Sequence, residues 1–146
     1  MLSNATTPAT RNAAQSDDQQ QVLAAAAALV AAFANNDSAA YFAAFSEDAS
    51  FVFHSCPTVL NSLNAYRTLW ASWQAEGFAV LACTSSNPVL SLHGDSAIFI
   101  HEVSTRLRVA GIESDSQERE TIVFRRQPDS QQWLACHEHL SLLPTD

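Results

Sequence analysis

The chain has 146 residues, of which 47% are hydrophobic and 15% charged, and this suits one globular domain with its own core. The formal net charge is -8 and all seven basic residues are arginine, which argues against nucleic acid or an anionic membrane as a partner. The 3 glycines lie far apart, so a glycine-rich phosphate-binding loop is excluded.

The first part of the chain predicts helices. Residues 1–15 are small and polar, so we predict a disordered tail there and a single domain over 16–146. Ser16 and Gln19 have the spacing of a capping box, and the alanine-rich run that follows predicts a helix over 17–35.

A short helix and a strand follow in the prediction. Asp37 or Ser38 can cap a second helix through Phe45, and the alternation over 49–54 predicts a strand that ends before Pro57. Asn61 or Ser62 can then cap a third helix, which Gly77 terminates.

The second half of the chain alternates with a period of two. Four strands are predicted over 78–92, 97–109, 117–126 and 132–142, with turn-forming residues between them. Helices followed by an antiparallel meander predict an α+β domain in which one curved sheet wraps around the helices.

Two further features bear on the compartment. The cysteines Cys56, Cys83 and Cys136 form no CxxC pair and are odd in number, which favours a reducing environment. The apolar run over 22–34 follows acidic residues rather than a basic segment and is too short to span a bilayer, so it does not predict a signal peptide or a membrane helix. We therefore predict a cytoplasmic protein.

Two segments of the chain carry a family resemblance. Residues 120–126, ETIVFRR, and residues 133–141, WLACHEHLS, are similar to the ending of the association domain of calcium/calmodulin-dependent protein kinase II and its bacterial relatives. The order of elements resembles the wider nuclear transport factor 2-like superfamily, which includes ketosteroid isomerase and the SnoaL-like proteins. This resemblance implies a cone-shaped, cystatin-like α+β fold, but because one such scaffold serves many activities it does not by itself assign one.

The strand alternation and the resemblance together predict a pocket. In such folds the concave sheet face lines a cavity, which places Glu118, Glu120 and Glu138 inward and, in the last strand, Leu134, Cys136 and Leu140 as well. Trp133, Ala135, His137 and His139 are then expected to face outward. The predicted ligand-binding residues are Phe51, Phe53, Tyr66, Trp70, Phe99, Val103, Ile122, Cys136 and Leu140.

The predicted pocket suggests acid–base chemistry. Acids that share an apolar cavity have raised pKa values, so Glu120 and Glu138 are candidate catalytic acids, with His101 exchanging protons with either. The ligand expected is a small apolar or weakly polar molecule, and the reaction that of a lyase or isomerase. No cofactor and no metal are expected, because a third ligand beside His137 and His139 is missing.

The resemblance also limits which activities carry over. The general-base Asp of ketosteroid isomerase corresponds to about Phe53 and its helix-one Tyr to about Leu29, so only its second acid has a counterpart, in Glu120. The carboxylate-binding arginines of the kinase association domain correspond to Val103, Ile122 and Leu140. These differences imply a ligand that is less anionic than a carboxylate.

Two alternatives stay open from the sequence. Glu120 could pair with an arginine and Glu138 could hydrogen-bond Tyr66 or His101, which would make both acids structural. The protein would then be a non-enzymatic oligomerisation or ligand-sensing module. In either case the outward set with Trp133, Val123, His137 and His139 is too apolar for a solvated face, so we expect a homodimer through the convex sheet face.

Overall fold

The protein has the predicted α+β order, in a computed structural model that describes residues 8–144. The described residues form three helices and one five-stranded sheet. Their bounds are α1 Pro8–Ala34, α2 Ser38–Ala43, β1 Phe45–Phe53, α3 Leu63–Ala75, β2 Ala79–His93, β3 Ser96–Val109, β4 Ile112–Arg126 and β5 Trp133–Leu142.

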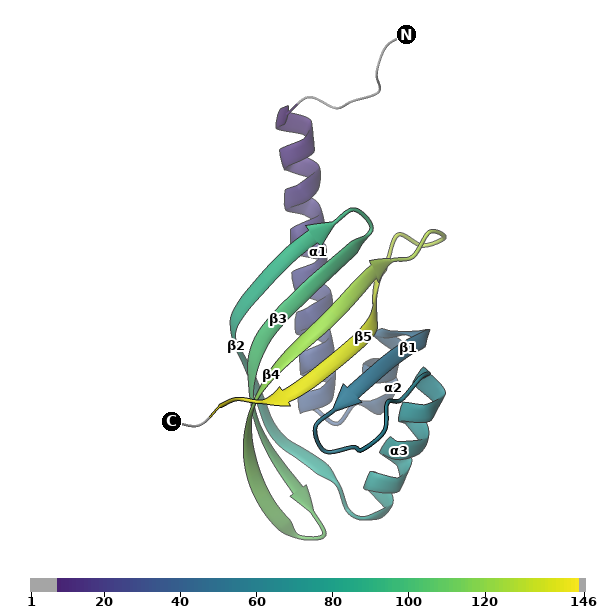
Figure 1. Cartoon of the computed structure of the whole chain (residues 1–146), viewed down its shortest axis with the longest axis vertical. Helices are drawn as coiled ribbons and strands as arrows, with labels where there is room; N and C mark the ends of the chain where they lie inside the picture. Colours follow the sequence, from purple (N-terminus) through teal and green to yellow (C-terminus); the bar gives the residue numbers. More distant parts are fainter. Residues whose placement is uncertain (1–7, 145–146) are drawn as a thin grey trace.

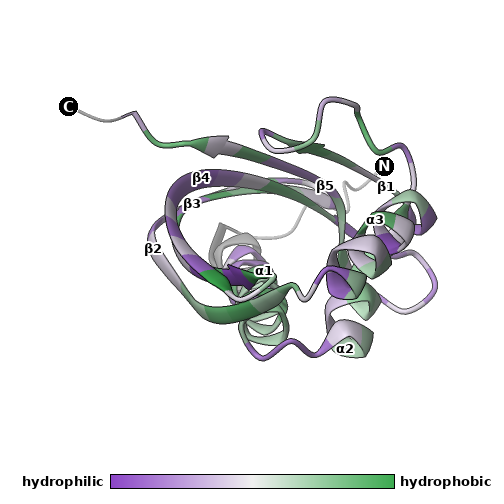
Figure 2. Cartoon of the chain, turned by 90° about the horizontal axis from the view of Figure 1, so that it is seen from below, coloured by the Kyte–Doolittle hydropathy of each residue, from purple (hydrophilic) through white to green (hydrophobic). Residues whose placement is uncertain are grey.

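The sheet has the order β1-β5-β4-β3-β2. Strands β2 to β5 form the predicted antiparallel meander, and β1 pairs with β5 in parallel. Figure 1 shows the long strands crossing in front of α1, and Figure 2 shows the sheet curling around α1 while α2 and α3 lie at its open side. The concave face of the sheet therefore faces the helices.

Helix α1 is longer than predicted. It begins at Pro8, well before the predicted start at residue 17, and proline suits a first helical turn because the N–H that it lacks has no partner there. Residues 1–7 of the predicted tail lie outside the described residues. The buried side chains Val22, Ala26 and Leu29 recur at helical spacing and fix the face that packs on the sheet. Within the described part of the chain, no helix has the length and apolarity needed to cross a membrane.

The predicted caps of the two short helices can now be assigned. The side chain of Asp37 accepts a hydrogen bond from the backbone N–H of Ala40, and Ser62 does the same for Ala65. Gly77 follows α3 with φ 83°, the left-handed conformation predicted for it. Strand β1 starts at Phe45, four residues before its predicted start at 49, because α2 ends early.

The core lies between the helices and the concave face of the sheet. Its centre is a cluster of tilted and edge-to-face aromatic rings, in which the ring of Tyr66 lies beside seven others. Trp70 and Trp73 belong to this packing, with ring centroids 6.2 Å apart.

A β-bulge in β5 corrects the predicted faces of that strand. Val123 pairs with His137 and Phe124 pairs with Ala135, so Cys136 is an extra residue opposite β4. The extra residue reverses the alternation: Glu138 and Leu140 face inward as predicted, whereas Leu134 faces outward against the prediction, and the predicted outward faces of Trp133 and Ala135 are wrong. These last two side chains are buried, with exposed fractions of 4% and 0%.

Candidate functional site

A cavity of about 420 Å³ lies inside the cone, between the concave sheet face and the helices. Its size and largely apolar wall are typical of small-molecule sites. The residues that line it are Leu29, Val30, Phe33, Tyr41, Phe53, His54, Ser55, Tyr66, Trp73, Glu76, Phe78, Cys83, Val103, Thr105, Leu107, Val109, Ser114, Ser116, Glu118, Glu120, Glu138 and Leu140.

Three buried carboxyl groups project from adjacent strands into this cavity. Glu118 and Glu120 alternate along β4, and Glu138 lies on β5. Leu140 pairs with Glu120 and Glu138 pairs with Ile122, so Glu138 and Glu120 are diagonal neighbours on the same face. The pleat of two antiparallel strands is thus sufficient to bring these two acids together.

Glu120 is held by a histidine. His101 pairs with it across β3 and β4, and the Nε2 atom of His101 lies 2.7 Å from Oε1 of Glu120. The Nδ1 atom of the same ring lies 2.6 Å from the hydroxyl of Ser85 on β2. The imidazole is fully buried with both nitrogens hydrogen-bonded, so it fixes the orientation of the Glu120 carboxyl.

Glu138 has no such partner. Its carboxyl is only 3% exposed, and its Oε2 atom makes no hydrogen bond within the described residues. Burial, and then the charge of the neighbouring Glu120, raise the pKa of Glu138 well above its usual value. Glu138 therefore favours its protonated form and can donate a hydrogen bond.

Two tyrosines and a cysteine adjoin the acids. The hydroxyl groups of Tyr41 and Tyr66 lie 2.9 Å apart, and burial together with the charge of Glu138 raises the pKa of both well above its usual value. Burial also raises the pKa of Cys83 to about 11. At neutral pH these groups are neutral, so Cys83 is a thiol and not a nucleophilic thiolate.

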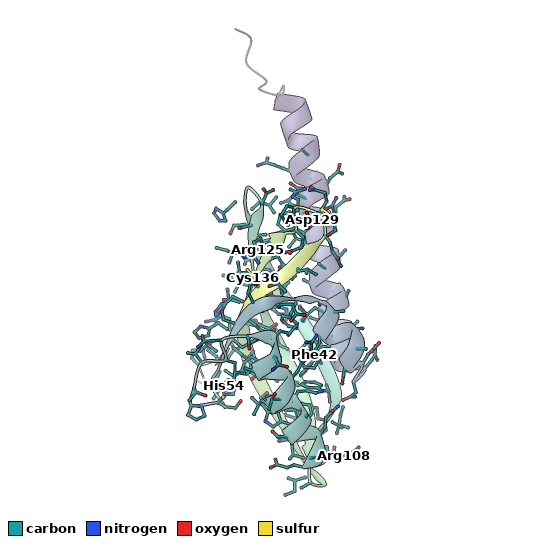
Figure 3. The ribbon with its side chains drawn as sticks, turned by 90° about the vertical axis from the view of Figure 1, so that its right-hand side faces the viewer. Phe42, His54, Arg108, Arg125, Asp129 and Cys136 are labelled. Atoms are coloured by element: carbon teal, nitrogen blue, oxygen red, sulfur yellow. The ribbon has the colours of Figure 1, made fainter. Side chains whose placement is uncertain are left out.

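The third acid, Glu118, is held by partners on the loop after β1 and on β4. The Oε2 atom of Glu118 lies 2.5 Å from Nε2 of His54, in the loop after β1, and its other oxygen accepts a hydrogen bond from Ser116 at 3.0 Å. Figure 3 shows His54 on this loop at the side of the molecule. Because both oxygens have partners, Glu118 joins the loop to the sheet.

The predicted site residues fall into three groups. Those in the cavity wall are Phe53, Tyr66, Val103, Leu140, Glu120 and Glu138. Phe51, Trp70, Phe99 and Ile122 are buried in the core behind the wall, and His101 lies behind Glu120. Cys136 lies elsewhere, next to Arg125 and Asp48, as Figure 3 shows for Arg125. Its prediction as a lining residue is wrong, because it is the bulge residue.

Several lining residues were not predicted as site residues. Cys83 and Thr105 pair across β2 and β3, and both line the cavity, as does Glu118. The alternation had placed Glu118 on the inner face, and Thr105 alternates with Val103 along β3, which is the signal that could have identified both residues. Leu29 and Phe33 of α1 are four residues apart on one helix face, and this spacing was available in the sequence as well.

The site has no grouping of metal-binding side chains. Over residues 8–144, no three or more His, Cys, Asp or Glu side chains are arranged to hold a metal ion. The Nδ1 atom of His137 forms a hydrogen bond with the hydroxyl of Ser50 at 2.8 Å. Burial and the nearby His139 lower the pKa of His137. The chemistry that the described side chains offer is proton transfer between carboxyl groups and a bound molecule.

Comparisons with known proteins identify the fold. Residues 22–146 match the SnoaL-like domain family, and none of the curated proteins matches the sequence. The solved structures that are similar include a nuclear transport factor 2-like protein with a cystatin-like fold from Novosphingobium aromaticivorans. It is 16% identical with a TM-score of 0.73, and the match covers 99% of this chain and 94% of that one.

Two more solved structures bear on the predicted resemblance. A ketosteroid isomerase-like protein from Erwinia carotovora is 16% identical, with a TM-score of 0.71 and coverage of 86% of this chain and 96% of that one. A putative calcium/calmodulin-dependent kinase II association domain from Exiguobacterium sibiricum is 13% identical, with a TM-score of 0.72 and coverage of 88% and 95%. At such identities the likeness establishes the fold alone, and the fold is the one predicted.

Proposed function

Because the chain belongs to the SnoaL-like domain family, we propose that it binds a small, largely apolar molecule in its cone and acts on it by proton transfer. The reaction would be that of a lyase or an isomerase, since both need a group that gives a proton and a group that takes one. Glu138 and Glu120 fill these roles, and His101 supports Glu120.

One observation carries this proposal. Glu138 presents a buried carboxyl with an unpartnered oxygen to a cavity that is large enough for a small molecule. An unsatisfied buried polar atom costs about 1–3 kcal/mol, so a purely structural role would usually supply a partner. A bound molecule would provide this partner, and a proton held in an apolar cavity is available for transfer.

The two acids have different surroundings, which favours a division of work. The carboxyl group of Glu120 is fixed by its hydrogen bond with His101, at 2.7 Å. In this fixed position it can accept a proton from a bound molecule. Glu138 holds its proton because burial and Glu120 raise its pKa. Two carboxyl groups in unlike environments are the usual arrangement of an acid–base pair.

The neighbouring folds support a proton-transfer activity without defining the reaction. One solved neighbour is described as ketosteroid isomerase-like. In this chain Phe53 stands at about the position of the general base of ketosteroid isomerase, and Phe53 lines the cavity. We therefore do not extend steroid isomerisation by that mechanism to this protein.

A non-enzymatic ligand-sensing or oligomerisation module is the alternative. A neighbour described as a putative kinase association domain supports it. A sensing module would bind a ligand in the cavity without reacting with it, and an oligomerisation module would not need a ligand. The unpaired oxygen of Glu138 favours the enzymatic proposal, because sensing alone does not require an acid beside a second acid.

Native mass spectrometry of the purified protein tests whether the cone holds a ligand. We expect an adduct of small mass, or a stabilising hit from thermal-shift screening of a small-molecule library. Leu140→Trp fills the cavity and should abolish both signals, whereas Leu134→Trp, on the opposite face of β5, should keep them. The absence of any binder in the wild-type protein would refute the proposal.

Turnover of the identified ligand then separates the enzyme from the module. Glu120→Gln and Glu138→Gln keep the size of the side chains but cannot exchange a carboxyl proton, so both variants should bind the ligand and lose turnover. A ligand that the wild-type protein returns unchanged would make the non-enzymatic alternative the better account.

A further inference from the structure

The ionisable groups in the cavity wall are almost all acids. Glu76 lies at the rim and Glu118, Glu120 and Glu138 lie deeper, with His54 as the one basic side chain among the residues that line the cavity. The sequence has no lysine. The cavity therefore offers negative charge or protonated carboxyl groups to a ligand.

The arginines with ion-pair partners are all outside this cavity. Arg106 pairs with Glu113 and Asp115 at the surface, and Arg125 pairs with Asp48. Arg126 pairs with Asp18 and with Asp95. None of them lines the cavity, so a carboxylate or phosphate ligand would find no guanidinium there.

The unpartnered Oε2 atom of Glu138 is a second, independent observation. Glu138 is only 3% exposed, and it lies in the cavity wall. Glu118 and Glu120 each have an imidazole partner, at 2.5 Å and 2.7 Å, whereas Glu138 has none. The cluster is thus short of one cationic partner, at Glu138.

Aromatic rings surround the same space. Phe33, Tyr41, Phe53, Tyr66, Trp73 and Phe78 all line the cavity. Ring faces attract cations, and the attraction is larger where water is excluded. A cavity with aromatic rings in its wall and carboxyl groups at one side is suited to a ligand that has an apolar skeleton and a positively charged group at one end.

We infer that the ligand of this cavity is a small organic amine with an apolar body, whose nitrogen binds as an ammonium ion between the carboxyl groups of Glu138 and Glu120. The inference rests on the proposed function in one respect, that the cone is a ligand cavity, and when an amine is bound it gives Glu138 the role of an ion-pair partner in place of the role of the acid. The apolar body lies against the aromatic rings, and the ammonium N–H groups donate to Oε2 of Glu138.

The protons of this binding step balance. Glu138 is protonated in the empty protein, and the amine is an ammonium ion in neutral solution. When the amine binds, Glu138 becomes a carboxylate and its proton leaves to the solvent, so the ammonium replaces the proton. Binding therefore strengthens as the pH rises through the range in which empty Glu138 is protonated.

Other titratable groups face Glu138 from each neighbouring element. They are Glu118 and Glu120 on β4, Cys83 on β2, Tyr41 on α2 and Tyr66 on α3, while His101 on β3 reaches it through Glu120. The wall from α1 is apolar, through Leu29, Val30 and Phe33. Cys83, Tyr41 and Tyr66 stay neutral below pH 8 because burial raises their pKa values, so these three groups release no proton in this range.

Matched sets of small probes test the inference. Each set carries an amine, an alcohol or a carboxylate on the same body, and the bodies are benzyl, 2-phenylethyl and cyclohexylmethyl. In isothermal titration calorimetry the amine of at least one set should bind at least about tenfold more tightly than its alcohol, a difference of about 1.4 kcal/mol, and no carboxylate should bind. Titration in two buffers of unlike ionisation enthalpy should show that a proton is released.

Variants locate the effect. In Glu138→Gln the amine should bind no more tightly than the alcohol, while the affinity for the alcohol stays within about twofold of wild type. Glu113→Gln removes an acid of β4 that pairs with Arg106 outside the cavity, and it should keep the preference for the amine. If Glu138→Gln is poorly folded, the pH dependence of amine binding to the wild-type protein remains a test, and affinity that is flat or falls with rising pH overturns the inference.

The failures of the two proposals are distinguishable. If alcohols bind as tightly as amines, or carboxylates bind best, the amine inference is overturned while a ligand cavity stands. If no probe binds but another molecule binds in the mass spectrometry test, the amine inference is again overturned. If neither test finds a binder, both proposals fail.

Discussion

The Glu138 side chain lowers the stability of the folded protein at neutral pH, although the proposed function depends on it. A carboxyl group that is 3% exposed and lacks a partner for one oxygen is costly to ionise. Its raised pKa means that the folded protein binds the proton more tightly than the unfolded chain. The stability that this proton contributes is fully present below the unfolded pKa, near 4.3, and is lost as the pH rises through the folded pKa.

Replacing Glu138 with Gln should therefore stabilise the protein at pH 7 to 8. The amide keeps the shape, can donate a hydrogen bond to Glu120 and needs no proton, so we expect a gain of about 1–3 kcal/mol. Urea unfolding of wild type and variant from pH 4 to 8 measures the difference. The two free energies of unfolding should approach each other at low pH and diverge as the pH rises.

Glu113→Gln serves as the control, because Glu113 is exposed and pairs with Arg106 at the surface. Its stability should stay within about 0.5 kcal/mol of wild type at each pH. A loss of stability in Glu138→Gln at pH 7 to 8 would show instead that the carboxylate is paired and structural.

The residues of the site were predictable where side-chain alternation alone decides their place. Glu120 and Glu138 were predicted to share the cavity, and they do so because their strands are neighbours in register. The hydrogen bond from His101 to Glu120 follows from the same pairing of β3 with β4. The lack of a partner for the Oε2 atom of Glu138 depends on three-dimensional packing, which no local pattern records.

At the scale of elements, one inserted residue in β5 limits what alternation can predict. A β-bulge changes the face of every residue on one side of it, and the sequence 133–138 contains no glycine that would mark one. The predicted faces were right after Cys136 and wrong before it. The start of α1 was missed because the spacing of Ser16 and Gln19 was interpreted as a helix cap, whereas both residues lie inside the helix.

Deleting Cys136 should disrupt this strand. Without the extra residue, either Trp133 and Ala135 must turn to the solvent or Glu138 and Leu140 must leave the cavity. Exposure of a buried tryptophan alone costs about 3–5 kcal/mol, so we expect the deletion variant to lose about 3 kcal/mol or more. Thermal unfolding followed by circular dichroism measures this loss.

Cys136→Ser keeps the bulge and changes one atom of a half-buried side chain, so it should stay within about 1 kcal/mol of wild type. If the deletion variant unfolds at the same temperature as Cys136→Ser, the bulge does not determine the faces of β5.

At the scale of the whole molecule, the change of period from helical to alternating was enough to predict the fold class. The three helices of the described residues precede the meander, and short turns join its strands β2 to β5, so the meander needs no crossover. The parallel pairing with β5 adds β1 as an edge strand of the sheet, and this long-range contact was not predicted. Sequence patterns define elements and their neighbours along the chain, whereas contacts between strands that are far apart in the sequence depend on the complete fold.

The convex sheet face remains the surface through which we propose a homodimer. Ile98 pairs with Val123, Val123 pairs with His137, and Thr121 pairs with His139, which makes one continuous patch of half-buried and exposed side chains. Trp133 is not part of it, because it is buried under Arg126, whose guanidinium lies 4.7 Å from the indole ring centroid. Light scattering at micromolar concentration should give the mass of a dimer.

Val123→Arg places a charge in the centre of this patch and should yield a monomer with unchanged helicity. Ile112→Arg changes a side chain that is 73% exposed at the end of β4, away from the patch, and should leave the mass unchanged. A monomer in the wild-type protein would contradict the assembly.

The three tryptophans occupy unequal positions, and this gives the protein an optical signal of its own. Trp70 and Trp133 are buried, with exposed fractions of 3% and 4%, whereas Trp73 lines the cavity. A molecule that enters the cone therefore changes the surroundings of one indole and leaves the other two nearly as they were. Intrinsic fluorescence can follow the filling of the cavity without a dye or a label, and Trp73→Phe should remove the response while leaving most of the emission.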